Sequence, residues 1–193
     1  MKIIEPSVEL IDDIDGQQIL RKLERCGKVS RKSQPGDAES FVRSIIKRGH
    51  ESVLEHVSLT FRIVCDRAIM AELTRHRHAS FTVESTRYVK YDELTFVDTG
   101  WKSEQRYGFR YYCYGVEAAY TQMVQSISPE QARAVLPLCL ATELYMTANL
   151  REIRHILKLR TDKAAHPQMR QVAGQILDIL REKLPVIVED IKP

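Results

Sequence analysis

The chain has 193 residues, enough for one domain with a sizeable core. Its composition, 44% hydrophobic and 28% charged, is that of an ordinary soluble globular protein, and a net charge of +3 is too small for a general nucleic-acid binder. The sequence shows no signal peptide and no stretch of membrane-spanning length, and its four cysteines form no CxxC pair. These features favour a cytoplasmic protein with reduced thiols and with neither a membrane nor a nucleic-acid partner.

The first elements are expected after a loop over residues 31–38. Asp37 can cap a helix from about residue 38 to 48, and Gly49 supplies its C-terminal stop. Apolar and polar side chains then alternate from Val57 to Cys65, and this period of two predicts a half-buried strand.

The middle of the chain predicts a short helix, two strands and a long helix. Asp66 is expected to cap the short helix, which delivers Arg75 at or just past its C-terminal end. Residues 86–91 and 94–97 are β-like, and residues 103–126 predict the long helix. Its tyrosines make this helix amphipathic enough for an interface, although packing in the core is the default.

The last part of the chain predicts three helix starts. Ser128 followed by a proline combines an N-cap with the residue favoured at the first helical position. Residues 138–147 fit either a strand or a helix. Asn149 is expected to cap a helix that reaches Leu159, and the last helix is expected from about residue 167 to 183.

The helix after Asn149 places an arginine beside apolar side chains. Its apolar stripe, at helical spacing, consists of Ile153, Ile156 and Leu157. Arg160 falls on the same side and needs an anionic or carbonyl partner, because a buried unpaired charge is costly. Either Asp162 or a bound ligand can fill that place. Arg151 and His155 lie one turn apart on a different face.

Residues 75–87, with the sequence RHRHASFTVESTR, crowd arginines, histidines and hydroxyl side chains together. Arginine keeps its charge and offers a planar fork of donors suited to phosphate, so the segment predicts a nucleotide or phosphate site. The alternative is a solvated basic face. His76 and His78 would share one face of a strand, a spacing that metal sites use, but the flanking arginines disfavour a cation there.

Two other patterns are weaker. The segment from His50 to His56 has the content of a metal cluster but lacks the HExxH spacing, so its histidines are interpreted as a loop ligand and a packed side chain. Ser85 is a weak candidate for a nucleophile, because no triad spacing is legible, and beside Arg87 its hydroxyl suits a phosphate at least as well.

The order and spacing of these residues resemble the flavin-dependent thymidylate synthases. Arg75-His76-Arg77, seven intervening residues and then Ser85 match the RHR-x7-S signature of that family. Further blocks follow in the family's order, namely Gly49-His50-Glu51-Ser52 with Glu55-His56, Ser85-Thr86-Arg87-Tyr88, the stretch from Ala132 to Leu138, and Asn149-Leu150-Arg151 with His155 and Leu159-Arg160-Thr161-Asp162. The resemblance therefore covers most of the chain.

The resemblance implies a fold and a reaction. The fold would be a single α+β domain over residues 1–193, with a largely antiparallel sheet and packed helices, assembled as a homotetramer whose active sites draw residues from several subunits. The reaction would be reductive methylation of dUMP to dTMP. Methylenetetrahydrofolate would supply the carbon, tightly bound FAD reduced by NADPH would supply the hydride, and no metal is implied.

The resemblance also assigns site residues. The FAD side would be formed by Ser52, Arg75, His76, Arg77, His78, Val83, Asn149, Arg151 and His155, with Ser30 as a further contact and His50 near the flavin and folate. The dUMP side would be formed by Glu72, Leu73, Thr74, Arg75, Val83, Glu84, Ser85, Thr86, Arg87, Arg133 and Arg160. Arg160 would bind the pyrimidine and favour its ionised form, so it is the residue expected to be catalytic.

Two positions depart from the family pattern. Glu72 stands where the family often has Gln, and its carboxylate would accept a ribose hydroxyl but repel phosphate. Val83 can contribute only backbone contacts.

Two other classes of function stay open. A nucleic-acid-binding module could use the Arg/His run and the tyrosines, but the low net charge and the lack of any known binding motif argue against it. A metal-dependent hydrolase could use His50, His76 and His78.

Overall fold

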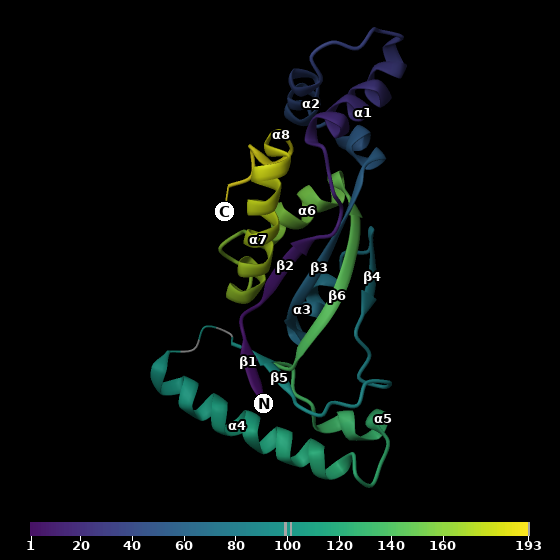
Figure 1. The fold of residues 1–193 in the computed structure, drawn as a ribbon. Helices are drawn as coiled ribbons and strands as arrows, with labels where there is room; N and C mark the ends of the chain where they lie inside the picture. Colours follow the sequence, from purple (N-terminus) through teal and green to yellow (C-terminus); the bar gives the residue numbers. More distant parts are fainter. Residues whose placement is uncertain (99, 101, 193) are drawn as a thin grey trace.

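A four-stranded antiparallel sheet forms the centre of the computed structural model, which describes residues 1–98, 100 and 102–192 (Figure 1). The strands are β1 (Lys2–Ile4), β2 (Ser7–Leu10), β3 (Ser58–Asp66), β4 (Ala79–Val83), β5 (Thr95–Val97) and β6 (Ala141–Asn149). The α-helices are α1 (Gly16–Lys28), α2 (Ala38–Lys47), α3 (Arg67–Leu73), α4 (Ser103–Met123), α5 (Pro129–Ala132), α6 (Leu150–Arg160), α7 (Pro167–Lys183) and α8 (Pro185–Val188). Short 3₁₀ helices are η1 (Val29–Arg31), η2 (Glu51–His56) and η3 (Arg133–Val135).

The sheet has the order β2-β3-β6-β4, and its two long strands pair along their whole length. Ser58 is opposite Asn149 at one end of the pair, and Asp66 is opposite Ala141 at the other. Side chains alternate in burial along both strands, as expected for a sheet with one covered face. The covered face carries the buried residues Leu59, Phe61, Ile63, Cys65, Leu144, Met146 and Ala148.

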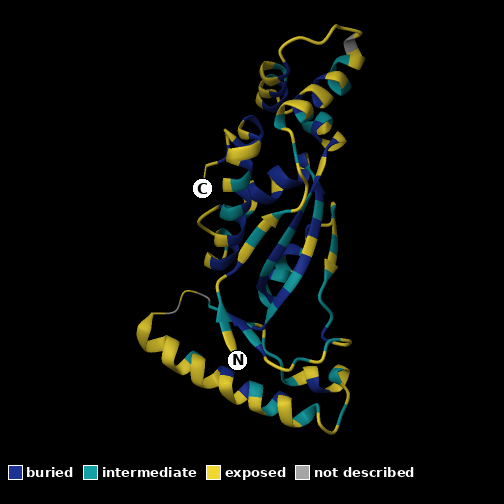
Figure 2. Ribbon diagram, viewed as in Figure 1, coloured by how far each residue is buried: buried dark blue, intermediate teal, exposed yellow. Residues whose placement is uncertain are grey.

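Helices α6, α7 and α8 pack beside the sheet, and α1 and α2 lie at its upper end in Figure 1. One large apolar cluster joins these helices to β3 and β6. A second cluster lies at the opposite end, where Phe96 of β5 meets Cys113 and Tyr120 of α4. The outer side of α4 is mostly exposed (Figure 2).

The predicted α+β fold with a largely antiparallel sheet is confirmed. β1 and β5 form a separate parallel pair. Among the described residues, no helix is long and apolar enough to cross a membrane.

Three helix starts are confirmed by their capping hydrogen bonds. The Asp37 carboxylate accepts the first free N–H groups of α2, Asp66 does so for α3, and Asn149 for α6. Gly49 ends the α2 region with a φ of +72°, which favours glycine because it has no Cβ. The predicted strand over residues 57–65 and the last helix are also confirmed.

Other expectations were wrong or incomplete. Residues 86–91 form a turn rather than a strand, because the backbone N–H groups of Tyr88 and Val89 both donate to the carbonyl of Ser85. The ambiguous segment before Asn149 is a strand, β6. Ser128 precedes a single helical turn and makes no side-chain capping bond. The patterns predicted nothing before residue 30, where the structure has β1, β2 and α1.

Met146 tests how far the covered face of the sheet stabilises the fold. The side chain is 0% exposed, so Met146→Ala should lower the free energy of unfolding by about 2–5 kcal/mol through lost burial and a cavity. The neighbouring Tyr145 points to the other face and is 39% exposed, so Tyr145→Ala should cost less than about 1 kcal/mol. Urea unfolding at one protein concentration measures both; equal losses would contradict the assignment of the faces.

Candidate functional site

The turn after α3 carries the arginine-rich segment. Asp66 fixes the start of α3 by accepting a hydrogen bond from the Ile69 backbone N–H at 2.7 Å. After the last helical turn, the His76 N–H donates to the Leu73 carbonyl at 3.0 Å, and β4 begins three residues later. The helix therefore delivers Arg75 just past its end, as predicted.

The side chains of this turn differ sharply in burial. His76 is only 7% exposed, whereas Arg75, Arg77 and His78 are exposed. Within the described ranges, these three exposed side chains make no hydrogen bond or ion pair. The turn thus presents two unpaired guanidinium groups and a free imidazole to a ligand.

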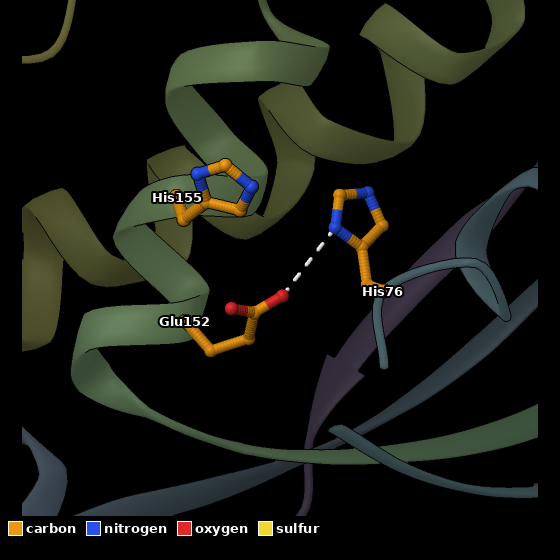
Figure 3. Close-up of side chains that lie close together, drawn as sticks. All are labelled: His76, Glu152 and His155. Atoms are coloured by element: carbon orange, nitrogen blue, oxygen red, sulfur yellow. Dashed lines mark ion pairs between the residues drawn. The ribbon is translucent and has the colours of Figure 1, made fainter. Parts of the chain in front are cut away.

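His76 is surrounded by polar groups of α6 (Figure 3). Its Nδ1 lies 3.4 Å from Glu152 Oε1, and its Nε2 lies 3.1 Å from Arg160 Nε. The ring of His155 meets it edge-on at 5.9 Å between centroids.

These contacts fix the protonation of His76. A guanidinium can only donate, so Nε2 of His76 must be the unprotonated acceptor, and the ring proton is then on Nδ1, facing Glu152. Burial lowers the pKa of His76, the nearby Arg160 lowers it further, and Glu152 opposes them in part. The imidazole is therefore neutral at neutral pH.

The three side chains in Figure 3 have the composition of a metal site, with ligand atoms within 4.8 Å of one another. However, Arg160 occupies one nitrogen of His76 and places a positive charge beside it. The group contains neither His50 nor His78, which the hydrolase alternative required. His76 and His78 do not share a strand face either, because they lie in a turn, one buried and one exposed.

A hollow of about 600 Å³ opens beside this group. It is lined by Glu51, Glu55, His78, Asn149, Arg151, Glu152 and His155. Four of these residues belong to the predicted FAD side. We call this cavity the first hollow.

Each carboxylate of the first hollow already has a partner. Arg151 Nη1 bonds to Glu55 Oε1 at 2.5 Å, and the buried Arg154 bonds to Glu51 at 3.1 Å. Glu152 Oε1 lies 3.4 Å from Nδ1 of His76, and the Glu152 N–H donates to the Asn149 cap. Two of the three carboxylates are therefore compensated by guanidinium groups.

A second hollow of about 530 Å³ lies on the other side of η2. Three predicted cofactor residues, Ser30, His50 and Ser52, line it together with Lys28 and Arg48. His50 and Ser52 are exposed, and the Ser30 hydroxyl donates to the Gly27 carbonyl at 3.1 Å. Seven of the eleven predicted FAD residues thus line one of the two hollows, and η2 contributes residues to both, whereas Arg75, His76, Arg77 and Val83 line neither.

This donor set fits a flavin dinucleotide. Its pyrophosphate needs charge-assisted donors, and the turn offers Arg75 and Arg77, which have no partner among the described residues. The hollows add imidazole, amide and hydroxyl groups suited to the remaining polar atoms.

On the predicted nucleotide side, Arg160 has an intramolecular partner. Its Nη1 lies 3.0 Å from Glu72 Oε2, and its Nη2 lies 3.5 Å from the Glu72 carbonyl. The expected alternatives were Asp162 or a ligand; Asp162 instead accepts the Ala164 N–H at 2.8 Å. The intramolecular partner is therefore Glu72 of α3, far away in the sequence, rather than Asp162.

The other predicted phosphate ligands lie at the far end of β4. Arg87 Nε bonds to Glu130 Oε1 of α5 at 2.9 Å, and the Arg87 N–H donates to the Ser85 hydroxyl at 3.3 Å. Arg133 begins η3, directly after α5, with its side chain exposed. β4 separates this group from the arginine turn by about 13 Å, the length of a five-residue strand.

The remaining predicted residues lie between these groups. Leu73 and Thr86 are buried, so they can offer a ligand only backbone atoms. The Thr74 hydroxyl donates to the Ala71 carbonyl at 3.1 Å, and Val83 is half-buried at the end of β4.

Both carboxylate oxygens of Glu84 accept hydrogen bonds within the chain. One carboxylate oxygen accepts the hydroxyl of Tyr91 at 2.8 Å, and the other accepts the Glu143 N–H at 3.3 Å. Burial raises the pKa of Tyr91, and the bond to Glu84 raises it further, so the phenol remains a donor. These contacts order the loop that carries Ser85.

The sequence patterns missed two residues of this region. Glu152 contacts His76 directly, and Arg154 pairs with Glu51 from inside the core. Arg154 follows Leu150 by four residues and precedes Leu157 by three, so helical spacing could have placed it on the buried side.

The neutral state of His76 predicts a pH dependence of stability. Because its pKa is lower in the fold than in the unfolded chain, the unfolded state binds the proton first as the pH falls. The contribution of the neutral His76 to the free energy of unfolding is present above about pH 6.5 and is lost as the pH falls below that value. On acidification below about pH 6.5, the Tm of the wild type should therefore fall more than the Tm of His76→Gln.

His56, which is exposed, supplies the control for this measurement. The His56→Gln variant should keep the pH dependence of the wild type. Parallel curves for the wild type and His76→Gln would contradict a neutral, buried His76.

Comparisons with known proteins identify the family of this chain. The family described as thymidylate synthase complementing protein matches residues 9–186. A probable flavin-dependent thymidylate synthase of Mycobacterium phage L5 is 31% identical over 210 residues, which cover 93% of this chain and 82% of the relative. The flavin-dependent thymidylate synthase of Pyrococcus horikoshii is 35% identical over 82% of this chain and 70% of its own.

Solved structures show the same fold. The UMP/dUMP methylase PolB from Streptomyces cacaoi, bound with 5-Br dUMP, superposes with a TM-score of 0.81 at 26% identity, over 98% of this chain and 96% of that one. The same enzyme bound with 5-Br UMP gives a TM-score of 0.82 at 25% identity, over 98% and 95%. With the sequence relatives, these matches confirm the resemblance: the chain belongs to the thymidylate synthase complementing protein family, that of the flavin-dependent thymidylate synthases.

Proposed function

We propose that this chain catalyses the reductive methylation of dUMP to dTMP, with methylenetetrahydrofolate as the carbon donor and FAD, reduced by NADPH, as the hydride source. The relatives named flavin-dependent thymidylate synthases and the dUMP methylase neighbour support the reaction class. The observation that carries the proposal is the turn after α3, where exposed arginines without partners in the described chain flank the buried His76, which accepts a hydrogen bond from the half-buried Arg160.

The cofactor side would use both hollows. Arg75 and Arg77 would hold the pyrophosphate, while His78, Asn149, Arg151 and His155 of the first hollow would contact the rest of the FAD. Ser30, His50 and Ser52 would complete the site from the second hollow. When bound, the flavin would supply the hydride that reduces the transferred carbon to a methyl group.

Arg160 is the residue we propose as catalytic. Its side chain is 21% exposed, so its charge is screened less than on an open surface. Beside a uracil ring it would stabilise negative charge that develops on the pyrimidine. The contacts to His76 and Glu72 leave further N–H groups of the guanidinium for the ring.

The phosphate of dUMP would be held by Ser85, Arg87 and Arg133. Because these residues and Arg160 lie at opposite ends of β4, we propose that a second copy of the chain completes each site, within a homotetramer. The outer face of α4 supports such an assembly (Figure 2). It exposes Tyr107, Tyr111, Tyr112 and Tyr114, each more than half exposed, and clusters of this kind mark protein interfaces.

We also propose that residues 1–193 act as one unit in the cytoplasm. The family match includes most residues of both apolar clusters, and the four cysteines are free thiols.

The direct test is conversion of dUMP to dTMP by the purified protein with FAD, NADPH and methylenetetrahydrofolate. The wild type should be yellow and active. Arg160→Ala should retain FAD but lose roughly 100- to 1000-fold in kcat, the effect expected for removing one group that stabilises transition-state charge.

Arg181→Ala, which removes an exposed arginine of α7, should leave the rate unchanged. Protein that binds no FAD on titration would overturn the proposed function. Stoichiometric zinc, with no flavin, would instead favour a metal-dependent hydrolase.

The exposed tyrosines of α4 provide a separate test of the proposed assembly. Tyr107→Glu combined with Tyr111→Glu places charges one turn apart on the exposed face of α4 and should reduce the molar mass of the assembly. Activity should fall with it, because sites would be left incomplete. Light scattering and the dTMP assay measure the two effects, with Arg181→Glu as the control; an unchanged mass would contradict this interface.

A further inference from the structure

Arg154 is the largest fully buried side chain among the described residues, with 0% exposure. It lies in α6 on the side that also buries Leu150 and Leu157. Proteins rarely bury an arginine without partners, because an uncompensated charge in the core costs several kcal/mol. Its partners therefore show what it does.

The guanidinium of Arg154 is held from two directions. Its Nε and Nη2 donate to Glu51 Oε1 at 3.3 and 3.1 Å. Its Nη1 and Nη2 donate to the two carboxylate oxygens of Asp190 at 2.7 and 2.8 Å, and Nη1 also donates to the Ile187 carbonyl. Burial alone would lower the pKa of Arg154, but the two carboxylates more than offset it and keep the group charged.

The two carboxylates have different surroundings. Asp190 follows α8, is 42% exposed and lines neither hollow. Glu51 is 20% exposed, begins η2 and lines the first hollow. Its neighbours His50 and Ser52 line the second hollow. The guanidinium of Arg154 thus contacts both Glu51 of η2, which contributes residues to both hollows, and Asp190 of the C-terminal segment.

The first hollow needs the ion pair between Arg154 and Glu51 if it is to receive an anion. Glu51, Glu55 and Glu152 all line it, and a free carboxylate there would repel phosphate. Arg151 pairs with Glu55, and Glu152 is only 8% exposed, with its Oε1 3.4 Å from Nδ1 of the neutral His76. Among the described residues, Glu51 has, besides Arg154, only the exposed Lys158 at 3.5 Å, and an exposed pair of that kind contributes little.

We propose that Arg154 is a positioning residue of the cofactor site, which cancels the charge of Glu51 from behind and fixes η2 so that the hollows accept an anionic dinucleotide. This inference rests on the proposed function, because it takes FAD as the ligand. It assigns to a core residue that touches neither hollow an effect on cofactor affinity.

The test measures the equilibrium dissociation constant of FAD by titration, using purified full-length variants. Arg154→Met leaves Glu51 uncompensated and should weaken FAD binding about tenfold, equal to about 1.4 kcal/mol. Combining Arg154→Met with Glu51→Gln removes both charges and should restore most of the affinity. A merely structural role of Arg154 predicts no such rescue.

Two single variants form a matched pair that keeps Arg154 in place. Glu51→Gln and Asp190→Asn each remove one carboxylate from the same guanidinium, so both should destabilise the fold similarly. Glu51→Gln should tighten FAD binding at low salt, with the gain shrinking at high salt, whereas Asp190→Asn should leave FAD binding unchanged. These variants keep the proposal testable if Arg154→Met does not fold.

The outcomes separate the two claims. A wild type that does not bind FAD overturns the proposed function. A wild type that binds FAD, with Glu51→Gln and Asp190→Asn equal in affinity or with no rescue in the double variant, overturns the role of Arg154 alone.

Discussion

The pairing of β3 with β6 determines where almost every functional side chain lies. These nine-residue strands pair in one register, from Ser58 opposite Asn149 to Asp66 opposite Ala141, and the bond from the Leu150 N–H to the Val57 carbonyl extends it. Antiparallel pairing brings the start of one strand to the end of the other. Consequently η2, which precedes β3, and α6, which follows β6, emerge side by side and form the walls of the first hollow.

Charge is compensated in layers around that hollow. Carboxylates of η2 meet guanidinium groups of α6, and a neutral His76 accepts from Arg160 while facing Glu152. Arg75 and Arg77 in the turn after α3 are exposed and have no partner in the described ranges. They line neither hollow, so the positive charge offered to a ligand comes from the turn beside His78, which lines the first hollow.

Local patterns predicted the parts of the fold that depend on local chemistry. Asp37, Asp66 and Asn149 each cap a helix because a short side chain accepts backbone N–H groups two or three residues ahead, and such a bond is legible in sequence. The turn over residues 86–91 was mistaken for a strand, because its side chains favour extended structure while its backbone closes on Ser85. Propensity gave no account of the short strands before residue 30, since long-range pairing forms them.

The same division applies to the site. The motif and family resemblance placed the arginine turn and the Asn149 helix, and the structure gathers most of the predicted FAD residues around η2. The partner of Arg160 could not be predicted, because Glu72 lies 88 positions away and no spacing rule joins them. Arg154 was not predicted, although its helical spacing from the buried Leu150 and Leu157 indicates the apolar side of α6.

The length of β4 sets the distance between the arginine turn and the loop that carries Ser85. It is an edge strand pinned to β6 from Ala79 opposite Ala148 to Val83 opposite Leu144. One inserted residue would lengthen it by about 3.3 Å and turn every later side chain to the opposite face. An odd change in the spacing of the RHR-x7-S signature would therefore reverse the face of Ser85 and lengthen the strand, so the spacing is constrained by strand geometry as well as by ligand chemistry.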